Sequence, residues 1–191
     1  MKTLILCDHP SFDQSIVNRR WIDEVKKYPD EFLIHNLQSS YPRGLIDRSR
    51  EHSLMDNNGP IVFQFPMHWF NSPPLLKLWC DKVLTEDWAY GKEYHLQGKR
   101  IAMAVTCGAP EQHYTHDGEV GKTIEELLVS IIETIRYCKA DFGGIFAFYG
   151  ASDQIHKENI SSVSVSARNY IDFLRGLSGT PGTGTSTASP A

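Results

Sequence analysis

Several short motifs that often reveal a function are absent from this chain of 191 residues. It has no Gly-x-Gly-x-x-Gly and no Gly-x-x-x-x-Gly-Lys motif, which disfavours a Rossmann dinucleotide site and a nucleotide triphosphatase. Its four cysteines lie far apart and form no Cys-x-x-Cys pair, so neither a zinc knuckle nor a disulfide framework is expected. His113 and His116 are three residues apart but have no third ligand at a recognisable spacing, so we expect no metal site.

The sequence also lacks long apolar runs and a strong excess of charge. No stretch approaches the roughly 18 apolar residues that a membrane-spanning helix needs. The first apolar run, Thr3 to Cys7, is too short for a signal peptide. The formal net charge is only −4, which argues against a surface built to bind nucleic acid. We therefore expect a soluble cytoplasmic protein with reduced cysteines and no nucleic-acid partner.

The composition is that of a single folded domain. Apolar residues make up 41% of the chain and charged residues 22%, as in globular proteins. Residues 178–191 contain only Gly, Ser, Thr, Pro and Ala, and such a segment buries too little apolar surface to order itself. We expect one domain over residues 1–177, followed by a flexible tail over residues 178–191.

Five short apolar runs have the pattern of strands buried on both faces, and they alternate with stretches of helical character. Such a series predicts an α/β fold, a doubly wound parallel sheet with helices on both faces. The expected strands are residues 3–7, 31–37, 61–65, 100–105 and 144–149. The expected helices start near residue 15 and end before Pro29, run from residues 73–74 past Val83, span about residues 123–137, and pass through residues 168–174. Residues 38–53 are expected to form a polar connection.

Ligands of open α/β sheets bind at the carboxyl ends of the strands, so the residues just after each strand are site candidates. The first such loop runs from Asp8 to Asn18. Its hydroxyl, amide and backbone N–H groups, placed at a helix start, fit a phosphate. Taken alone, Ser15 is more simply explained as a cap of the following helix.

The second loop, from Phe65 to Pro74, places Trp69 and Phe70 at a strand end. These aromatic residues suit a wall for a flat ring, and the flanking prolines restrict the backbone so that its amides can face a ligand. The same side chains suit a cap on the core or a subunit interface, and the spacing does not decide between these interpretations.

The third loop, which follows the fourth strand, combines small residues with polar ones. Gly108 and Ala109 permit close approach of the backbone to a ligand, while His113 and Tyr114 supply polar groups to a bound ring. Cys107 invites a redox role, but cysteine is commonly a small buried apolar residue, and we favour that second hypothesis.

Five motifs, spread over residues 1 to about 175, are more specific together than any one of them alone. They are His9-Pro10 with Ser15 and Asn18, Pro66 to Phe70, Pro73 to Trp79 with Asp81 to Val83, Trp88 to Gly91, and Thr106 to Ala109. In combination they resemble the NAD(P)H:quinone oxidoreductases of the flavodoxin-like superfamily. That group contains DT-diaphorase and the ancillary quinone reductases of potassium efflux.

The resemblance implies a flavodoxin-like fold, with a five-stranded doubly wound parallel sheet and helices on both faces. It also implies a flavin, FMN or FAD, across the carboxyl edge of the sheet, NAD(P)H as co-substrate, and a homodimer. Trp88 and Tyr90 would then belong to the pocket of the opposite subunit. The residues implied to hold the flavin are His9, Ser15, Ile16, Val17, Asn18, Pro66, Met67, His68, Trp69, Phe70, Thr106, Cys107, Gly108 and Ala109.

On this basis we hypothesise a ping-pong cycle in which NAD(P)H reduces the flavin, leaves, and is replaced by a quinone that takes both electrons. The backbone amides of Gly108 and Ala109 would stabilise negative charge on the reduced ring. A catalytic Tyr114, His113 or His116 would assist them.

Two other functions fit the same motifs. One is a one-electron carrier of the flavodoxin kind, which the small net charge supports little, because such carriers depend on charge complementarity with their partners. The other is a regulatory flavoprotein subunit that docks on a membrane potassium-efflux antiporter. An azo- or nitro-reductase would share the first half-reaction, and no motif identifies the second substrate.

Overall fold

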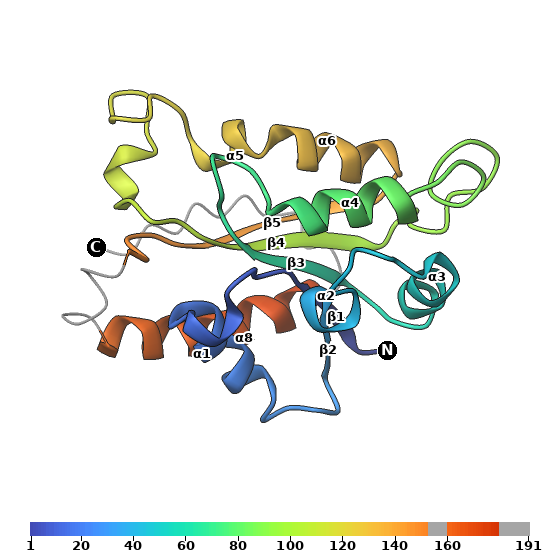
Figure 1. Ribbon diagram of the computed structural model, residues 1–191, viewed down its shortest axis with the longest axis horizontal. Helices are drawn as coiled ribbons and strands as arrows, with labels where there is room; N and C mark the ends of the chain where they lie inside the picture. Colours follow the sequence, from blue (N-terminus) through green and yellow to red (C-terminus); the bar gives the residue numbers. More distant parts are fainter. Residues whose placement is uncertain (153–159, 180–191) are drawn as a thin grey trace.

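The computed structural model describes residues 1–152 and 160–179 (Figure 1). Five parallel strands form one sheet in the order β2-β1-β3-β4-β5, which confirms the predicted flavodoxin-like, doubly wound sheet. The predicted tail lies outside the described residues from residue 180 onward. The strands are β1 (Thr3–Cys7), β2 (Phe32–Asn36), β3 (Ile61–Pro66), β4 (Arg100–Thr106) and β5 (Asp141–Phe148).

Helices cover both faces of the sheet, as Figure 1 shows. α1 (Val17–Val25) and α8 (Ile160–Leu177) pack against each other on one face. The other face carries α2 (Leu37–Ser40), α3 (Arg48–Asp56), α4 (Pro74–Val83), α5 (Ile124–Leu127) and α6 (Val129–Tyr137). In the part of the chain that the structure describes, no helix combines the length and hydropathy needed to cross a bilayer.

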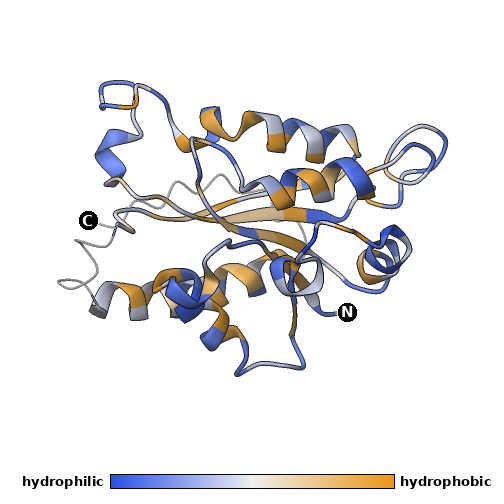
Figure 2. Ribbon diagram, in the orientation of Figure 1, coloured by the Kyte–Doolittle hydropathy of each residue, from blue (hydrophilic) through white to orange (hydrophobic). Residues whose placement is uncertain are grey.

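Two apolar clusters form the core, one on each face of the sheet. Successive side chains of a strand point to opposite faces, so Leu4 and Leu6 of β1 enter one cluster while Ile5 and Cys7 enter the other. Figure 2 shows apolar residues concentrated along the strands and on the helix surfaces that face them. β1, β3 and β4 are therefore buried on both faces, as their apolar runs predict. The edge strands β2 and β5 are only partly buried, because each has a neighbouring strand on one side alone.

The prediction of a polar connection over residues 38–53 is wrong, because α2 and α3 lie there. Apolar spacing does not reveal α3, since the residues it buries are Glu51 and Met55, one of them charged. The sequence feature that could have predicted the start of α3 is its N-cap, Asp47. The Asp47 side chain accepts the N–H of Arg50 at 3.1 Å.

Two other boundaries differ from the expected ones. The helix expected over residues 123–137 is interrupted at Leu128, which divides it into α5 and α6. β5 begins at Asp141 rather than Gly144, because Asp141 already pairs with Arg100. A bulge further along β5 shifts the register, and Gly144 has a φ of 89° there. The other predicted strands and helices are present.

A buried carboxylate joins four elements on the face that carries α3 and α4. The Glu51 side chain is fully buried and accepts hydrogen bonds from His35 Nε2 at 2.9 Å, from Trp79 Nε1 at 2.7 Å and from the Tyr41 hydroxyl. Burial alone would raise the pKa of Glu51, but these hydrogen bonds outweigh it and leave the pKa below its usual value. Glu51 is therefore an ionised, fully paired group inside the fold.

Replacing this carboxylate should destabilise the protein. We expect Glu51→Gln to lower the free energy of unfolding by on the order of 3 kcal/mol, because the amide turns an NH₂ group toward buried donors. Urea unfolding at neutral pH measures this. Since the folded-state pKa of Glu51 is lowered, its stabilisation is complete above the unfolded pKa of about 4.3 and is lost as the pH falls through the folded value.

The matched control is Glu133→Gln on α6, where both Glu133 and its partner Arg136 have side chains 58% exposed. We expect that exposed pair to contribute less than about 1 kcal/mol. Equal losses from both substitutions would contradict the role assigned to Glu51.

Candidate flavin-binding cleft

A cleft of about 290 Å³ opens at the carboxyl ends of the strands. These strand ends lie at the left of Figure 1. The cleft lies between β1 and β3, where the strand order reverses. The chain crosses from β1 to β2 on one side of this point and from β3 to β4 on the other. Open α/β sheets bind their ligands at such a switch point. The cleft is lined by His9, Ser11, Gln14, Ser15, Ile16, Val17, Pro66, Met67, His68, Thr106, Gly108 and Ala151.

All three loops that the sequence singles out contribute to this cleft. The predicted contacts that do not line it are Asn18, Trp69, Phe70, Cys107 and Ala109. Asn18 and Cys107 are buried in the protein, whereas Trp69 and Phe70 are exposed. The cleft thus gathers most of the predicted contacts, and the roles of the individual residues stay predictions.

His9 follows β1, and a backbone hydrogen bond fixes where its proton lies. The N–H of Ser11 donates to His9 Nδ1 at 3.2 Å, so the neutral ring carries its proton on Nε2. Burial, and after it the charge of nearby His68, lowers the pKa of His9. His9 therefore offers the cleft a neutral N–H donor.

The start of α1 supplies backbone donors. Ser15 Oγ accepts the N–H of Asn18 at 3.2 Å, so Ser15 does cap this helix while also lining the cleft. Among the described residues, the N–H groups of Ile16 and Val17 meet no acceptor. Free N–H groups at a helix start attract anions, so this wall can hold a phosphate.

The second loop, from Phe65 to Pro74, forms a second wall of the cleft. Its backbone turns sharply at Trp69 and Phe70. Their φ angles are 47° and 63°, a left-handed conformation that costs a non-glycine residue about 1–2 kcal/mol. Two backbone hydrogen bonds between His68 and Asn71, of 2.8 and 3.0 Å, close the turn. Trp69 itself is 94% exposed. Strain of this kind often occurs where a ligand or partner binds.

The third loop, which follows β4, forms the third wall of the cleft. It contains a buried thiol, Cys107, and a glycine that faces open space, Gly108. Cys107 is fully buried, and burial raises its pKa to about 12, so the thiol stays protonated. A Cβ atom at Gly108 would meet no other atom within 4 Å, so the position faces open space. The N–H of Gly108 has no acceptor within residues 1–152 and 160–179.

Tyr114 lies behind this wall rather than in it. Its ring is buried and packs against Tyr149, with ring centroids 5.5 Å apart. Tyr114 does not line the cleft. Burial, and then the Cys107 thiol, raises the pKa of Tyr114, so its hydroxyl keeps its proton.

The two histidines of the same loop are paired with carboxylates. His113 Nδ1 lies 2.9 Å from a Glu119 oxygen, and His116 Nε2 lies 3.0 Å from a Glu126 oxygen. Neither histidine lines the cleft. Their catalytic role therefore stays a prediction that the geometry of this chain does not itself support.

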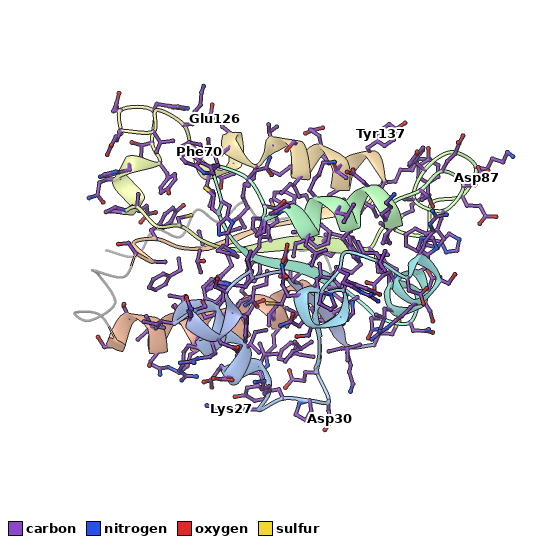
Figure 3. All side chains as sticks on the ribbon, viewed as in Figure 1. Lys27, Asp30, Phe70, Asp87, Glu126 and Tyr137 are labelled. Carbon is purple, nitrogen blue, oxygen red and sulfur yellow. The ribbon has the colours of Figure 1, made fainter. Side chains whose placement is uncertain are left out.

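Trp88 and Tyr90 lie in the loop after α4 and are also absent from the cleft. The Trp88 ring stacks on His52, with centroids 3.8 Å apart and planes 4° from parallel, and only 8% of the residue is exposed. In Figure 3 the neighbouring Asp87 lies at the opposite end of the molecule from Phe70. Neither residue therefore serves the cleft of its own chain.

A larger groove of about 720 Å³ lies between α4 and α6. Tyr90 is part of its lining, and Val129 and Tyr137 of α6 expose 50% and 69% of their surface nearby. The groove is lined by His68, Trp69, Asn71, Ser72, Pro74, Leu76, Lys77, Cys80, Asp81, Leu84, Tyr90, Ser130, Ile131 and Thr134.

Sequence reasoning missed three residues of the cleft: Ser11, Gln14 and Ala151. Ser11 and Gln14 belong to the first predicted loop but have no distinctive pattern. Ala151 follows β5, and its N–H donates to the Cys107 carbonyl at 2.8 Å. Applying the strand-end rule to the fifth strand would have pointed to Ala151, although a methyl group has no chemical signature of its own.

The chain is similar to known proteins along most of its length. A family model described as a flavodoxin-like fold, Flavodoxin_2, matches residues 1–171. A Bacillus subtilis (strain 168) protein named uncharacterized NAD(P)H oxidoreductase YrkL is 39% identical over 176 residues, which cover 92% of this chain and 98% of that protein. The glutathione-regulated potassium-efflux system ancillary protein KefF of Enterobacter sp. (strain 638) is 37% identical over 147 residues, covering 76% and 82%.

A solved structure has the same fold at higher identity. It is the general stress protein 14 of Treponema denticola in complex with FMN, with a TM-score of 0.86 and 43% identity over 93% of this chain and 99% of that one. The chain therefore belongs to the flavodoxin-like family Flavodoxin_2, and the family resemblance drawn from its motifs is confirmed.

Proposed function

We propose that this protein is a cytoplasmic, FMN-dependent NAD(P)H:quinone oxidoreductase. The observation that carries the proposal is the cleft, because one wall offers phosphate-binding groups and another offers the open space at Gly108. Two relatives support it, one named an NAD(P)H oxidoreductase and one solved with FMN. The quinone rests on the motif resemblance, and four free cysteines fit a reducing compartment.

The first wall fits the phosphate of FMN. The N–H groups of Ile16 and Val17 and the Nε2–H of His9 meet no acceptor among residues 1–152 and 160–179, and they adjoin the positive end of the α1 dipole. No described lining residue is Lys or Arg. The phosphate would thus be held by neutral donors and the helix dipole rather than by a salt bridge.

The other walls fit the flat ring. Gly108 leaves room beside its N–H, from which no described residue accepts, and pre-oriented N–H donors stabilise negative charge without reorganisation. A bound flavin would accept a hydride from NAD(P)H and deliver two electrons to a quinone. Among the three predicted proton donors we prefer Tyr114, because burial raises its pKa and its hydroxyl keeps its proton. It would act from behind the wall at Gly108, since Tyr114 does not itself line the cleft.

Reduction by nicotinamide cofactors tests the enzymatic proposal. The purified protein should show flavin absorbance, and the released cofactor should have the mass of FMN. Under anaerobic stopped flow, excess NADH or NADPH should bleach that absorbance, and benzoquinone should restore it. A flavin that stays oxidised with both cofactors contradicts the proposal, and bleaching without benzoquinone turnover would favour a one-electron carrier.

Filling the space at Gly108 tests whether the flavin lies there. Gly108→Ala should leave the unfolding free energy of the apoprotein unchanged, because the methyl group meets no protein atom. It should weaken FMN binding roughly tenfold, equivalent to about 1.4 kcal/mol, because the methyl occupies ligand space. Fluorescence titration of FMN measures this. Gly176→Ala, which also adds a methyl group in open space, should leave FMN affinity unaltered. Equal FMN affinities of the Gly108→Ala and Gly176→Ala variants would mean that the flavin ring does not lie beside Gly108.

The groove between α4 and α6 supports a homodimer as part of this proposal. Exposed apolar side chains beside a groove are typical of interfaces. Trp69 lines this groove, and Val129 and Tyr137 are exposed on α6, which forms one of its sides. A second copy of the chain is the occupant we infer. Tyr90 lines this groove and would there contribute to the opposite subunit. Trp88 does not line it and is buried against His52.

A charge placed on this face should separate the subunits. We expect Val129→Glu to convert a dimer into a folded monomer in sedimentation velocity, because the carboxylate would be buried without a partner. Val165→Glu on α8 is the matched control, since Val165 is 45% exposed on the opposite face of the sheet. A monomeric wild-type protein, or dimers in both variants, would contradict this interface.

Similarity to KefF favours a second candidate, an ancillary subunit of a potassium-efflux transporter. In that case the protein would bind a membrane transporter peripherally. Co-purification of a transporter with the tagged protein from its own cells would support it, and the oxidoreductase assays above are independent of that result.

A further inference from the structure

Four buried polar side chains form a connected row that ends in the wall of the cleft. The Tyr170 hydroxyl lies 3.1 Å from Gln64 Oε1, and Gln64 Nε2 lies 3.2 Å from Asn18 Oδ1. Asn18 Nδ2 in turn lies 2.9 Å from Thr106 Oγ1. Tyr170 and Gln64 are fully buried, and Asn18 and Thr106 are only 1% and 5% exposed. The row connects α8, β3, α1 and the end of β4.

A backbone carbonyl determines the direction of every bond in this row. Gln64 Nε2 lies 3.2 Å from the carbonyl oxygen of Asn18, which can only accept, so the amide nitrogen must face Asn18. The Gln64 oxygen then faces Tyr170 and accepts from its hydroxyl. The second hydrogen of Nε2 goes to Asn18 Oδ1, which leaves Asn18 Nδ2 to donate to Thr106. The donors all point from Tyr170 toward Thr106.

Thr106 therefore ends the row with an unused hydrogen. Its Oγ1 accepts from Asn18, and a hydroxyl that accepts keeps its own hydrogen for another acceptor. Among the described residues Oγ1 donates to none. Because Thr106 lines the cleft, this hydrogen is available to a molecule bound there.

The other end of the row holds its hydrogen firmly. Burial, and then the Cys7 thiol, raises the pKa of Tyr170 well above its usual value. The side chains of the row are all uncharged. The direction of the bonds is therefore set by geometry alone.

We propose that Gln64 is a positioning residue that holds the Asn18 amide so that the Thr106 hydroxyl donates to an acceptor atom of the bound flavin. The inference rests on the proposed function and deepens it, because Gln64 does not itself line the cleft. Without Gln64, the Asn18 amide can turn its oxygen toward Thr106, whose hydrogen is then drawn away from the cleft.

A double-mutant cycle tests this. Gln64→Met removes both donors at similar size, and Thr106→Val removes the hydroxyl. Each should raise the dissociation constant of FMN for the apoprotein roughly fivefold to tenfold, measured by quenching of flavin fluorescence. The combined variant should bind FMN no more weakly than Thr106→Val alone, because Gln64 acts through that hydroxyl.

Two controls separate positioning from general loss of structure. Tyr170→Phe breaks the row at its other end but leaves Gln64 held by the Asn18 carbonyl, so FMN affinity should stay within about twofold. Thr106→Ser keeps the hydroxyl and should retain binding. Urea unfolding of each apoprotein identifies variants that do not fold. If Gln64→Met is one of them, Gln64→Leu replaces it, since leucine also lacks a donor and is shorter than methionine.

The outcomes distinguish the inference from the proposed function. Unchanged FMN affinity in the Gln64 variant, or an equal loss with and without Thr106→Val, overturns the inference and leaves the proposed function intact. A wild-type apoprotein that binds no FMN overturns both. If the double-mutant cycle gives the expected FMN affinities but the protein does not oxidise NAD(P)H, only the enzymatic proposal is contradicted.

Discussion

Parallel pairing of all five strands is the constraint on which the rest of the structure depends. Each strand must be followed by a crossover that returns the chain to the end of the sheet where the strands begin. All the carboxyl ends therefore lie together at the other end. β1 and β3 are neighbours whose crossovers leave in opposite directions, and the loops after them separate. Segments far apart in the sequence, near His9, Met67 and Gly108, thereby come to line one cleft.

Burial of the sheet on both faces makes each interior polar group costly unless it is paired. Among the described residues, no buried side-chain nitrogen or oxygen lacks a hydrogen-bond partner. The pairing takes two forms. Around Glu51 an ionised carboxylate gathers donors from neighbouring elements, so that cluster depends on pH. Along the row from Tyr170 to Thr106 the groups are neutral, and the row has a direction instead of a charge.

The location of the site could be predicted from the sequence to a large extent. Buried strands are visible as apolar runs, and the loops that follow them were the right ones. The roles of single residues were harder to predict. Asn18 was expected to touch a ligand, but its amide is buried against Thr106, a partner 88 positions away in the chain. Residue spacing left Trp69 open as a ring wall, a cap on the core or part of an interface. The structure gives it a positive φ, which is rare for a tryptophan, and leaves it 94% exposed beside the groove, so a cap on the core is the interpretation it disfavours.

The sequence by itself determined the fold class, the strands, most helices and the family, because these depend on local periodicity and on short motifs. Only the tertiary structure revealed α3, whose buried face carries Glu51 rather than an apolar stripe. It alone decided which residues line the cleft, and that the Asn18 amide is buried against Thr106. The physical reason is that burial and hydrogen-bond direction depend on partners that folding brings together from distant parts of the chain.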